Sequence, residues 1–112
     1  MHAWVPTFAI YLAASMFEIA GCFAFWTWMK LGKSGWWLVP GTFSLIIFAW
    51  LLTLVPVDAA GRAFAIYGGV YIAASILWLY LIERQEPDRW DLIGATVCIL
   101  GAAIILLVPR TA

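Results

Sequence analysis

The sequence predicts an all-α integral membrane protein, a single domain of four transmembrane helices over residues 1–112. Two thirds of its residues are hydrophobic, and only six basic and six acidic residues carry charge. A soluble domain of this size needs far more polar surface. Apolar stretches of about 20 residues, the length that crosses a hydrocarbon core as a helix, recur four times. A net charge near zero and the lack of a basic face argue against a nucleic-acid partner.

The four predicted spans cover residues 5–29, 37–55, 63–82 and 92–108. The first is interpreted as a retained helix, because no positively charged segment precedes it as in a signal peptide. Short links make neighbouring spans antiparallel. Prolines fall near the span ends or in the links, where helix sterics tolerate them: Pro6, Pro40, Pro56, Pro87 and Pro109.

The distribution of lysine and arginine favours both termini outside the cytoplasm. Four of these residues fall on the side of the first and third links, and two fall on the opposite side. Such a small excess is also compatible with insertion in both orientations. The four are Lys30, Lys33, Arg84 and Arg89, and the two are Arg62 and Arg110.

No catalytic or metal-binding set is recognised in the sequence. Cys22 and Cys98 both fall inside apolar stretches and form no cluster with His2. We interpret them as buried structural thiols, and we expect no disulfide, metal or cofactor. An enzyme is not expected, because no nucleophile with its base, no phosphate loop and no metal cluster is present.

Glu18 is the only acidic or basic residue well inside a predicted span. At 1.5 Å per residue it lies roughly 17–20 Å from either end of the first span, near the bilayer midplane. A charge there costs at least about 2.5–3.5 kcal/mol and usually marks an ion or substrate path. The structural alternative is a protonated glutamate that packs helices together, but glutamine would serve that role at lower cost.

Helical spacing places small and aromatic residues on the same face as Glu18. Small neighbours leave room for a partner helix or a ligand, and the aromatic residues would bound that space. The small residues are Ala14, Ser15, Gly21 and Cys22, and the aromatic ones are Tyr11 and Phe25.

The third span carries an aromatic stripe at helical spacing. Such stripes are usually core packing, but a tyrosine hydroxyl at membrane depth needs a hydrogen-bond partner, and aromatic faces attract organic cations. Gly68 and Gly69 interrupt the stripe and allow a helix bend or a close helix approach. The stripe consists of Phe64, Tyr67, Tyr71, Ser75 and Trp78.

In the fourth span, Gly94 and Gly101 are two turns apart on one face, and Val97 lies between them. This spacing predicts a close-packing seam, either within the chain or between two chains.

One carboxylate and one seam per chain suggest a homodimer with two facing glutamates. Lipid disfavours the charged form of an acid, and two adjacent acids titrate as a pair. Such a pair can hold protons and release them when a cation arrives. If the site opens alternately to the two sides, proton and cation exchange by antiport.

The sequence resembles the YnfA family of small bacterial inner-membrane proteins, which is grouped beside the small multidrug resistance transporters. The stretches "FEIAGCFAFWTWMK", "FAWLLTLVP", "AGRAFAIYGGVYIA" and "WDLIGA" carry the resemblance. It implies a small multidrug resistance-like homodimer in the inner membrane, with an antiparallel arrangement. It also implies proton-coupled efflux of small organic cations, such as quaternary ammonium or guanidinium-type compounds.

The resemblance also assigns residue roles. Glu18 matches the essential membrane-embedded glutamate, and Gly94, Val97 and Gly101 match the dimer-forming motif of the fourth helix. "AFAIYGGV" resembles the multidrug-family stretch "AYAIWSGVG". Phe64 therefore stands where tyrosine is usual, Tyr67 where tryptophan is usual and Tyr71 where glycine is usual, while Gly69 is kept. These replacements change the shape and polarity of the expected cavity.

Two other interpretations remain open. The chain could transport a neutral or zwitterionic metabolite, in which case ligand affinity would ignore pH between about 5 and 9. Alternatively, it could be a non-transporting subunit that docks on a larger complex through the glycine seam, with Glu18 joining helices.

Overall fold

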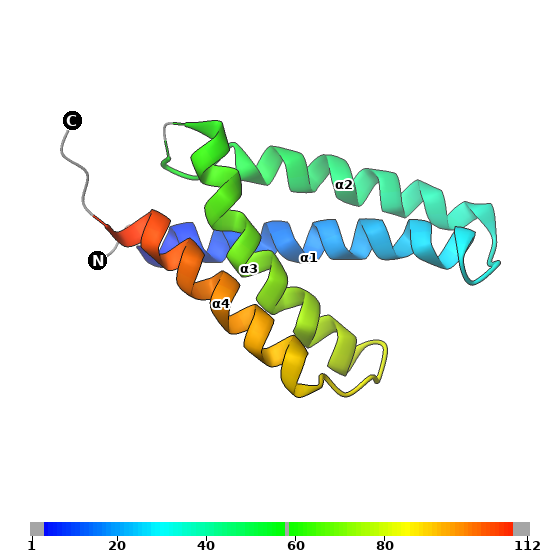
Figure 1. Ribbon diagram of the computed structural model, residues 1–112. Helices are drawn as coiled ribbons and strands as arrows, with labels where there is room; N and C mark the ends of the chain where they lie inside the picture. The colour runs from blue at the N-terminus through cyan, green and yellow to red at the C-terminus, as the bar shows by residue number, and fades with distance from the viewer. Residues whose placement is uncertain (1–3, 58, 109–112) are drawn as a thin grey trace. The chain divides into compact units, whose positions relative to one another are not determined.

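The chain folds into two compact helical units, Met1–Pro56 and Val57–Ala112. The computed structural model describes residues 4–57 and 59–108, with the backbone alone at positions 4 and 5. His2, Pro109 and Arg110, used in the sequence argument, lie outside the described residues. The regular elements of the described part are all helical: α1 (Trp4–Met29), the 3₁₀ helix η1 (Gly35–Trp37), α2 (Leu38–Leu52), α3 (Ala60–Leu81) and α4 (Arg89–Leu107) (Figure 1).

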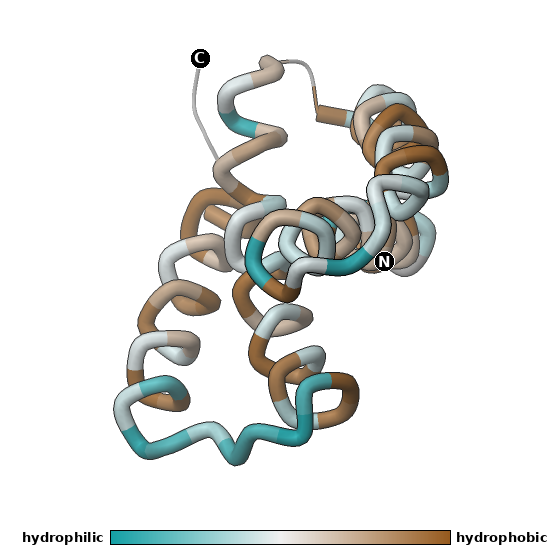
Figure 2. Tube along the Cα trace, turned by 90° about the vertical axis from the view of Figure 1, so that its right-hand side faces the viewer, coloured by the Kyte–Doolittle hydropathy of each residue, from teal (hydrophilic) through white to brown (hydrophobic). Residues whose placement is uncertain are grey.

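All four predicted spans are confirmed as helices long and apolar enough to cross a membrane. The second consists of η1 and α2 together, Gly35–Leu52. Large apolar side chains are exposed on every long helix, which suits helices that have lipid rather than water around them. Hydrophilic residues concentrate in the connection between α3 and α4 (Figure 2).

The helix boundaries differ from the predicted spans where polar residues form the ends. The fourth span was expected to begin at residue 92, but α4 begins at Arg89. Asp88 and Asp91 form a capping box there, with the Asp91 N–H donating to Asp88 at 2.8 Å and the Asp88 N–H donating to Asp91 at 3.0 Å. Such a box satisfies free N–H groups of the first turn and extends the helix beyond its apolar run.

The start of α3 and the end of α2 also differ from the predicted spans. The helix α3 begins at Ala60, three residues before the expected span, and therefore includes Arg62 in its first turn. The helix α2 ends at Leu52 rather than residue 55, because the chain turns there. The Thr53 N–H donates to the Trp50 carbonyl at 3.0 Å, and Pro56 follows.

The helices α1 and α3 end in the same way, on a residue in the left-handed region. After α1 this residue is Gly32, with φ +67°, and the Lys33 N–H donates back to the Thr27 carbonyl at 3.2 Å. After α3 it is Arg84, with φ 59°. Glycine adopts this conformation freely, whereas a residue with a Cβ is strained by roughly 1–2 kcal/mol.

In the first unit, α1 and α2 lie side by side and pack through small residues (Figure 1). A Cβ added at Gly41 would lie 2.7 Å from the Ala24 Cβ, and one added at Gly21 would lie 2.9 Å from the Gly41 carbonyl oxygen. One hydrogen bond joins the same two helices, from the Ser44 hydroxyl to the Phe17 carbonyl at 2.7 Å. Small residues and interhelical hydrogen bonds are the means by which helices associate in lipid.

In the second unit, α3 packs on α4 through Gly69. A Cβ at this position would clash with the Ala102 Cβ and would lie 3.4 Å from the Cys98 carbonyl oxygen. At Gly68, one residue earlier, nothing lies within 4 Å of an added Cβ. The sequence allowed either a helix bend or a close helix approach at these glycines, and Gly69 provides a close approach.

Within the second unit, the predicted seam on α4 does not pack against α3. Nothing lies within 4 Å of a Cβ built at Gly94 or Gly101, and Val97 is 63% exposed. The contact between α3 and α4 uses a different face of α4, which contains Ala102.

The neighbouring glycines of α3 give a matched test of this packing. We expect Gly69→Ala to lower the free energy of unfolding by roughly 1–3 kcal/mol, because the added methyl overpacks the contact with α4. Gly68→Ala should leave it unchanged or raise it by up to about 1 kcal/mol through helix propensity. Unfolding in mixed micelles titrated with dodecyl sulfate and followed by circular dichroism measures both, and equal effects would contradict the assigned contact.

Candidate functional site

Glu18 lies near the middle of α1, roughly 17–21 Å from the two helix ends at 1.5 Å per residue. Its side chain is half-buried. The other charged residues of the four described helices, Arg62, Arg89 and Asp91, all lie in first turns. Among the described helices, Glu18 is therefore the one charged residue near the middle of a helix.

The residues that share the Glu18 face of α1 differ in their exposure. Tyr11 and Ser15, two turns and one turn before it, are 1% and 0% exposed. The Ser15 hydroxyl donates to the Leu12 carbonyl of its own helix at 2.7 Å. One turn after Glu18, Cys22 is exposed. Gly21, also one turn after Glu18, is buried, so the carboxylate has buried neighbours on both sides and one exposed neighbour, Cys22.

Glu18 lies beside the surface through which α1 contacts α2, not within it. Gly21 and Ala24 provide the close approach to α2. At 100° per residue, Gly21 is about 60° from Glu18 around the helix and Ala24 is about 120° away. The helix α2 therefore approaches α1 on the flank of the carboxylate.

The predicted aromatic stripe lies on α3, and its two tyrosines form a pair. The ring centroids of Tyr67 and Tyr71 are 5.9 Å apart, with ring planes inclined by 39°. Tyr67 is buried and Tyr71 is half-buried, whereas Phe64 at the start of the stripe is 54% exposed. Two aromatic faces at this spacing form a surface that attracts organic cations.

The tyrosine pair lies on the side of α3 that faces away from α4. Gly69, which contacts α4, is two residues from each tyrosine and therefore about 160° around the helix from both. The packing of the second unit thus leaves the tyrosines outside the contact between its two helices.

The interpretation of the two cysteines as buried thiols was wrong. Cys22 and Cys98 are free and exposed on the surfaces of α1 and α4. The inference from apolar surroundings to burial holds for a soluble core, but an apolar thiol next to lipid has no need to be covered.

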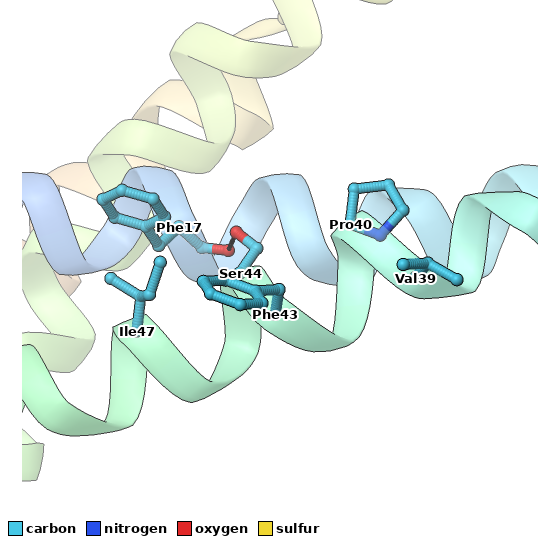
Figure 3. A pocket seen from close by; sticks show the side chains of 6 residues that line it. All are labelled: Phe17, Val39, Pro40, Phe43, Ser44 and Ile47. Carbon is cyan, nitrogen blue, oxygen red and sulfur yellow. Dashed lines mark hydrogen bonds between the residues drawn. The ribbon is translucent and has the colours of Figure 1, made fainter.

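One surface feature was missed by the sequence argument, an apolar groove along α1 and α2 in the first unit (Figure 3). An interhelical hydrogen bond, from the Ser44 hydroxyl to the Phe17 carbonyl, joins two of its lining residues. A proline and a serine four residues apart on an otherwise apolar helix were the available signal. The groove is lined by Phe17, Val39, Pro40, Phe43, Ser44 and Ile47.

Comparison with known families decides the assignment of the chain. The profile of the family described as "Uncharacterised BCR, YnfA/UPF0060 family" matches residues 4–111. The chain belongs to the YnfA/UPF0060 family.

Two relatives within the YnfA/UPF0060 family match over almost their whole length. A UPF0060 membrane protein of Methylocella silvestris is 63% identical over 106 residues, which cover 95% of this chain and 98% of the relative. A UPF0060 membrane protein of Rhizobium etli is 62% identical over 104 residues, covering 93% and 98%. No solved structure matches the chain.

The family and the fold together give the location. The relatives are named membrane proteins, and four helices of this chain are able to span a bilayer. Helical spans distinguish such proteins from the β-barrels of the outer membrane. The YnfA/UPF0060 chain is therefore a multi-pass protein of the inner membrane.

The position of Glu18 predicts that its charge is not needed for folding. We expect Glu18→Gln to leave the free energy of unfolding in lipid bicelles unchanged or to raise it, because a midplane charge costs about 2.5–3.5 kcal/mol to insert. Glu83→Gln, in the exposed connection after α3, is the control and should have no effect. A clear loss of stability in Glu18→Gln alone would instead identify the carboxylate as a group that holds helices together.

Proposed function

We propose that the protein exports small organic cations in exchange for protons, and that Glu18 is the group at which the two compete. The observation that supports this most directly is a half-buried carboxylate at the middle of α1. A charged group at that depth is costly and is retained where ions or substrates pass. Quaternary ammonium and guanidinium-type compounds are the substrates that this chemistry suits.

The exchange follows from the chemistry of one carboxyl group. When protonated, Glu18 is neutral and compatible with a low-dielectric surrounding, and when ionised it attracts a cation. A cation that binds displaces the proton, and a proton that arrives displaces the cation. Coupling requires only that the carboxylate be exposed to the two sides of the membrane in turn.

The neighbours of Glu18 on α1 differ in exposure and in hydrogen bonding. Tyr11 and Ser15 before it are buried, and Cys22, one turn after it, is exposed. Ser15 uses its hydroxyl hydrogen within its own helix, so it remains an acceptor only. The Ser15 hydroxyl therefore donates within its own helix and not to the Glu18 carboxylate.

The aromatic pair of α3 is proposed to contact the cation. Tyr67, which is buried, and Tyr71, which is half-buried, form an aromatic pair with a centroid distance of 5.9 Å. Cations without N–H groups, such as tetraalkylammonium, cannot donate hydrogen bonds and are attracted by aromatic faces instead. This preference favours permanently charged organic cations over hydrated metal ions.

The transporting unit is proposed to be a homodimer, in which the seam on α4 forms the contact between the two chains. Gly94 and Gly101 expose helix backbone that the described chain itself leaves uncontacted. In lipid, a surface of this kind allows a second helix to approach closely. An antiparallel pairing would place two Glu18 carboxylates in one transporting unit.

Proton-coupled transport can be tested in liposomes loaded with tetraethylammonium. When the external solution is acidified, we expect cation efflux together with acidification of the lumen, measured with an entrapped pH dye. Glu18→Gln should abolish both signals, while Glu18→Asp should keep the exchange at a lower rate. Glu86→Gln, in the exposed connection before α4, should behave as the wild type. Efflux that persists in Glu18→Gln, or that proceeds without proton movement, would refute the proposal.

The seam can be tested by adding volume to it. We expect Gly101→Leu to reduce the dimer fraction in detergent by about tenfold or more, because a side chain would separate the two helix backbones. Leu100→Phe adds volume at an exposed position about 100° around α4 and should leave the dimer intact. Sedimentation equilibrium measures both, and equal dissociation of the two variants would show that the seam is not the interface.

A further inference from the structure

The connection between α1 and α2 contains two lysines and no acidic residue. Lys30 and Lys33 are the only charged residues between Glu18 and Asp58 in the sequence, and both are exposed. The connection between α3 and α4 differs, because its acidic residues outnumber its basic ones. The end of the first unit is therefore suited to an anion at the membrane surface.

Aromatic residues place this end of the unit at the membrane interface. Trp36, in η1, is 80% exposed, and tryptophan rings favour the level of the lipid headgroups. The Lys30 ammonium lies 5.4 Å from the centre of the Trp26 ring. That contact orients the ammonium through its charge and leaves N–H donors for an anionic oxygen.

The apolar groove begins next to this charged end. Val39 and Pro40 lie in the first turn of α2, directly after the connection, and Ile47 lies roughly 12 Å deeper along the helix. The sticks in Figure 3 show these side chains following the length of α2 towards Phe17 of α1. A groove of this length matches about nine methylene groups of an extended hydrocarbon chain.

The one polar side chain that lines the groove, Ser44, already uses its hydroxyl hydrogen within the protein. The Ser44 hydroxyl donates to the Phe17 carbonyl at 2.7 Å, within the protein. The remaining lining side chains are apolar, namely Phe17, Val39, Pro40, Phe43 and Ile47.

We propose that the first unit binds an anionic phospholipid, with its phosphate at Lys30 and Lys33 and one acyl chain in the groove. The charge at the connection selects the headgroup, and the groove leads from that headgroup towards the bilayer centre. The site uses neither Glu18 nor the tyrosines of α3. It therefore stands independently of the proposed transport and can be tested without a transport assay.

The test is retention of lipid by the purified full-length protein, counted by native mass spectrometry. The protein is equilibrated in detergent with equal amounts of phosphatidylglycerol and phosphatidylcholine that carry the same acyl chains. We expect phosphatidylglycerol to be retained preferentially. Each lysine should contribute about fivefold, so Lys30→Gln with Lys33→Gln should reduce the preference by about 25-fold. Arginine at both positions should restore it.

Groove variants separate acyl-chain binding from headgroup attraction. Ile47→Trp should fill the groove and lower retention of phosphatidylglycerol by about tenfold. Ile46→Trp adds the same side chain at the adjacent exposed position, which does not line the groove, and should leave retention unchanged. Circular dichroism of each variant shows that the helices remain folded.

Several results would overturn the proposal. Equal retention of the two lipids, or the same loss in Ile46→Trp and Ile47→Trp, would show that the groove is not a lipid site. Displacement of phosphatidylglycerol by millimolar inorganic phosphate would show that the lysines bind phosphate without the acyl chain. Disulfide formation between Val39→Cys chains, prevented by Ile47→Trp, would show that a second copy of the protein occupies the groove.

Discussion

A peptide group inside a bilayer has no water with which to form hydrogen bonds, so each one must be satisfied within the protein. This constraint forces the apolar chain into helices and also governs how the helices meet. Lipid removes the hydrophobic advantage of helix association, so contact depends on close packing. The approaches at Gly41 in the first unit and Gly69 in the second are the means by which each pair of helices holds together.

The same constraint gives meaning to a single acidic residue. In a chain with six acidic and six basic residues, the described helices carry every other charge in a first turn, and Glu18 alone lies at mid-depth. The contacts that hold α1 to α2 do not require a carboxylate, because glycine, alanine and one serine supply them. A charged group at that depth is costly and usually marks an ion or substrate path, which is why we propose exchange of a proton for a cation at Glu18.

The exposed surfaces of α2 and α4 differ in their chemistry. The helices α2 and α4 are mostly exposed, so their surfaces are available to lipid or to a second chain. On α4 the available surface contains backbone at two glycines, which suits another helix. On α2 it contains a groove next to two lysines, which suits an anionic lipid. Different surface chemistry thus separates a proposed protein contact from a proposed lipid contact.

The sequence alone determined the four helices, because a run of about 20 apolar residues has only one stable form in lipid. It also identified Glu18 and the tyrosine pair, since the period of a helix decides which residues share a face. Tertiary structure decided which apolar surfaces are used: Gly69 contacts a neighbouring helix, the seam at Gly94 does not, and both cysteines are exposed. The physical reason is that an apolar side chain is equally stable against lipid and against protein, so hydrophobicity reveals that a helix spans the membrane but not which way it faces.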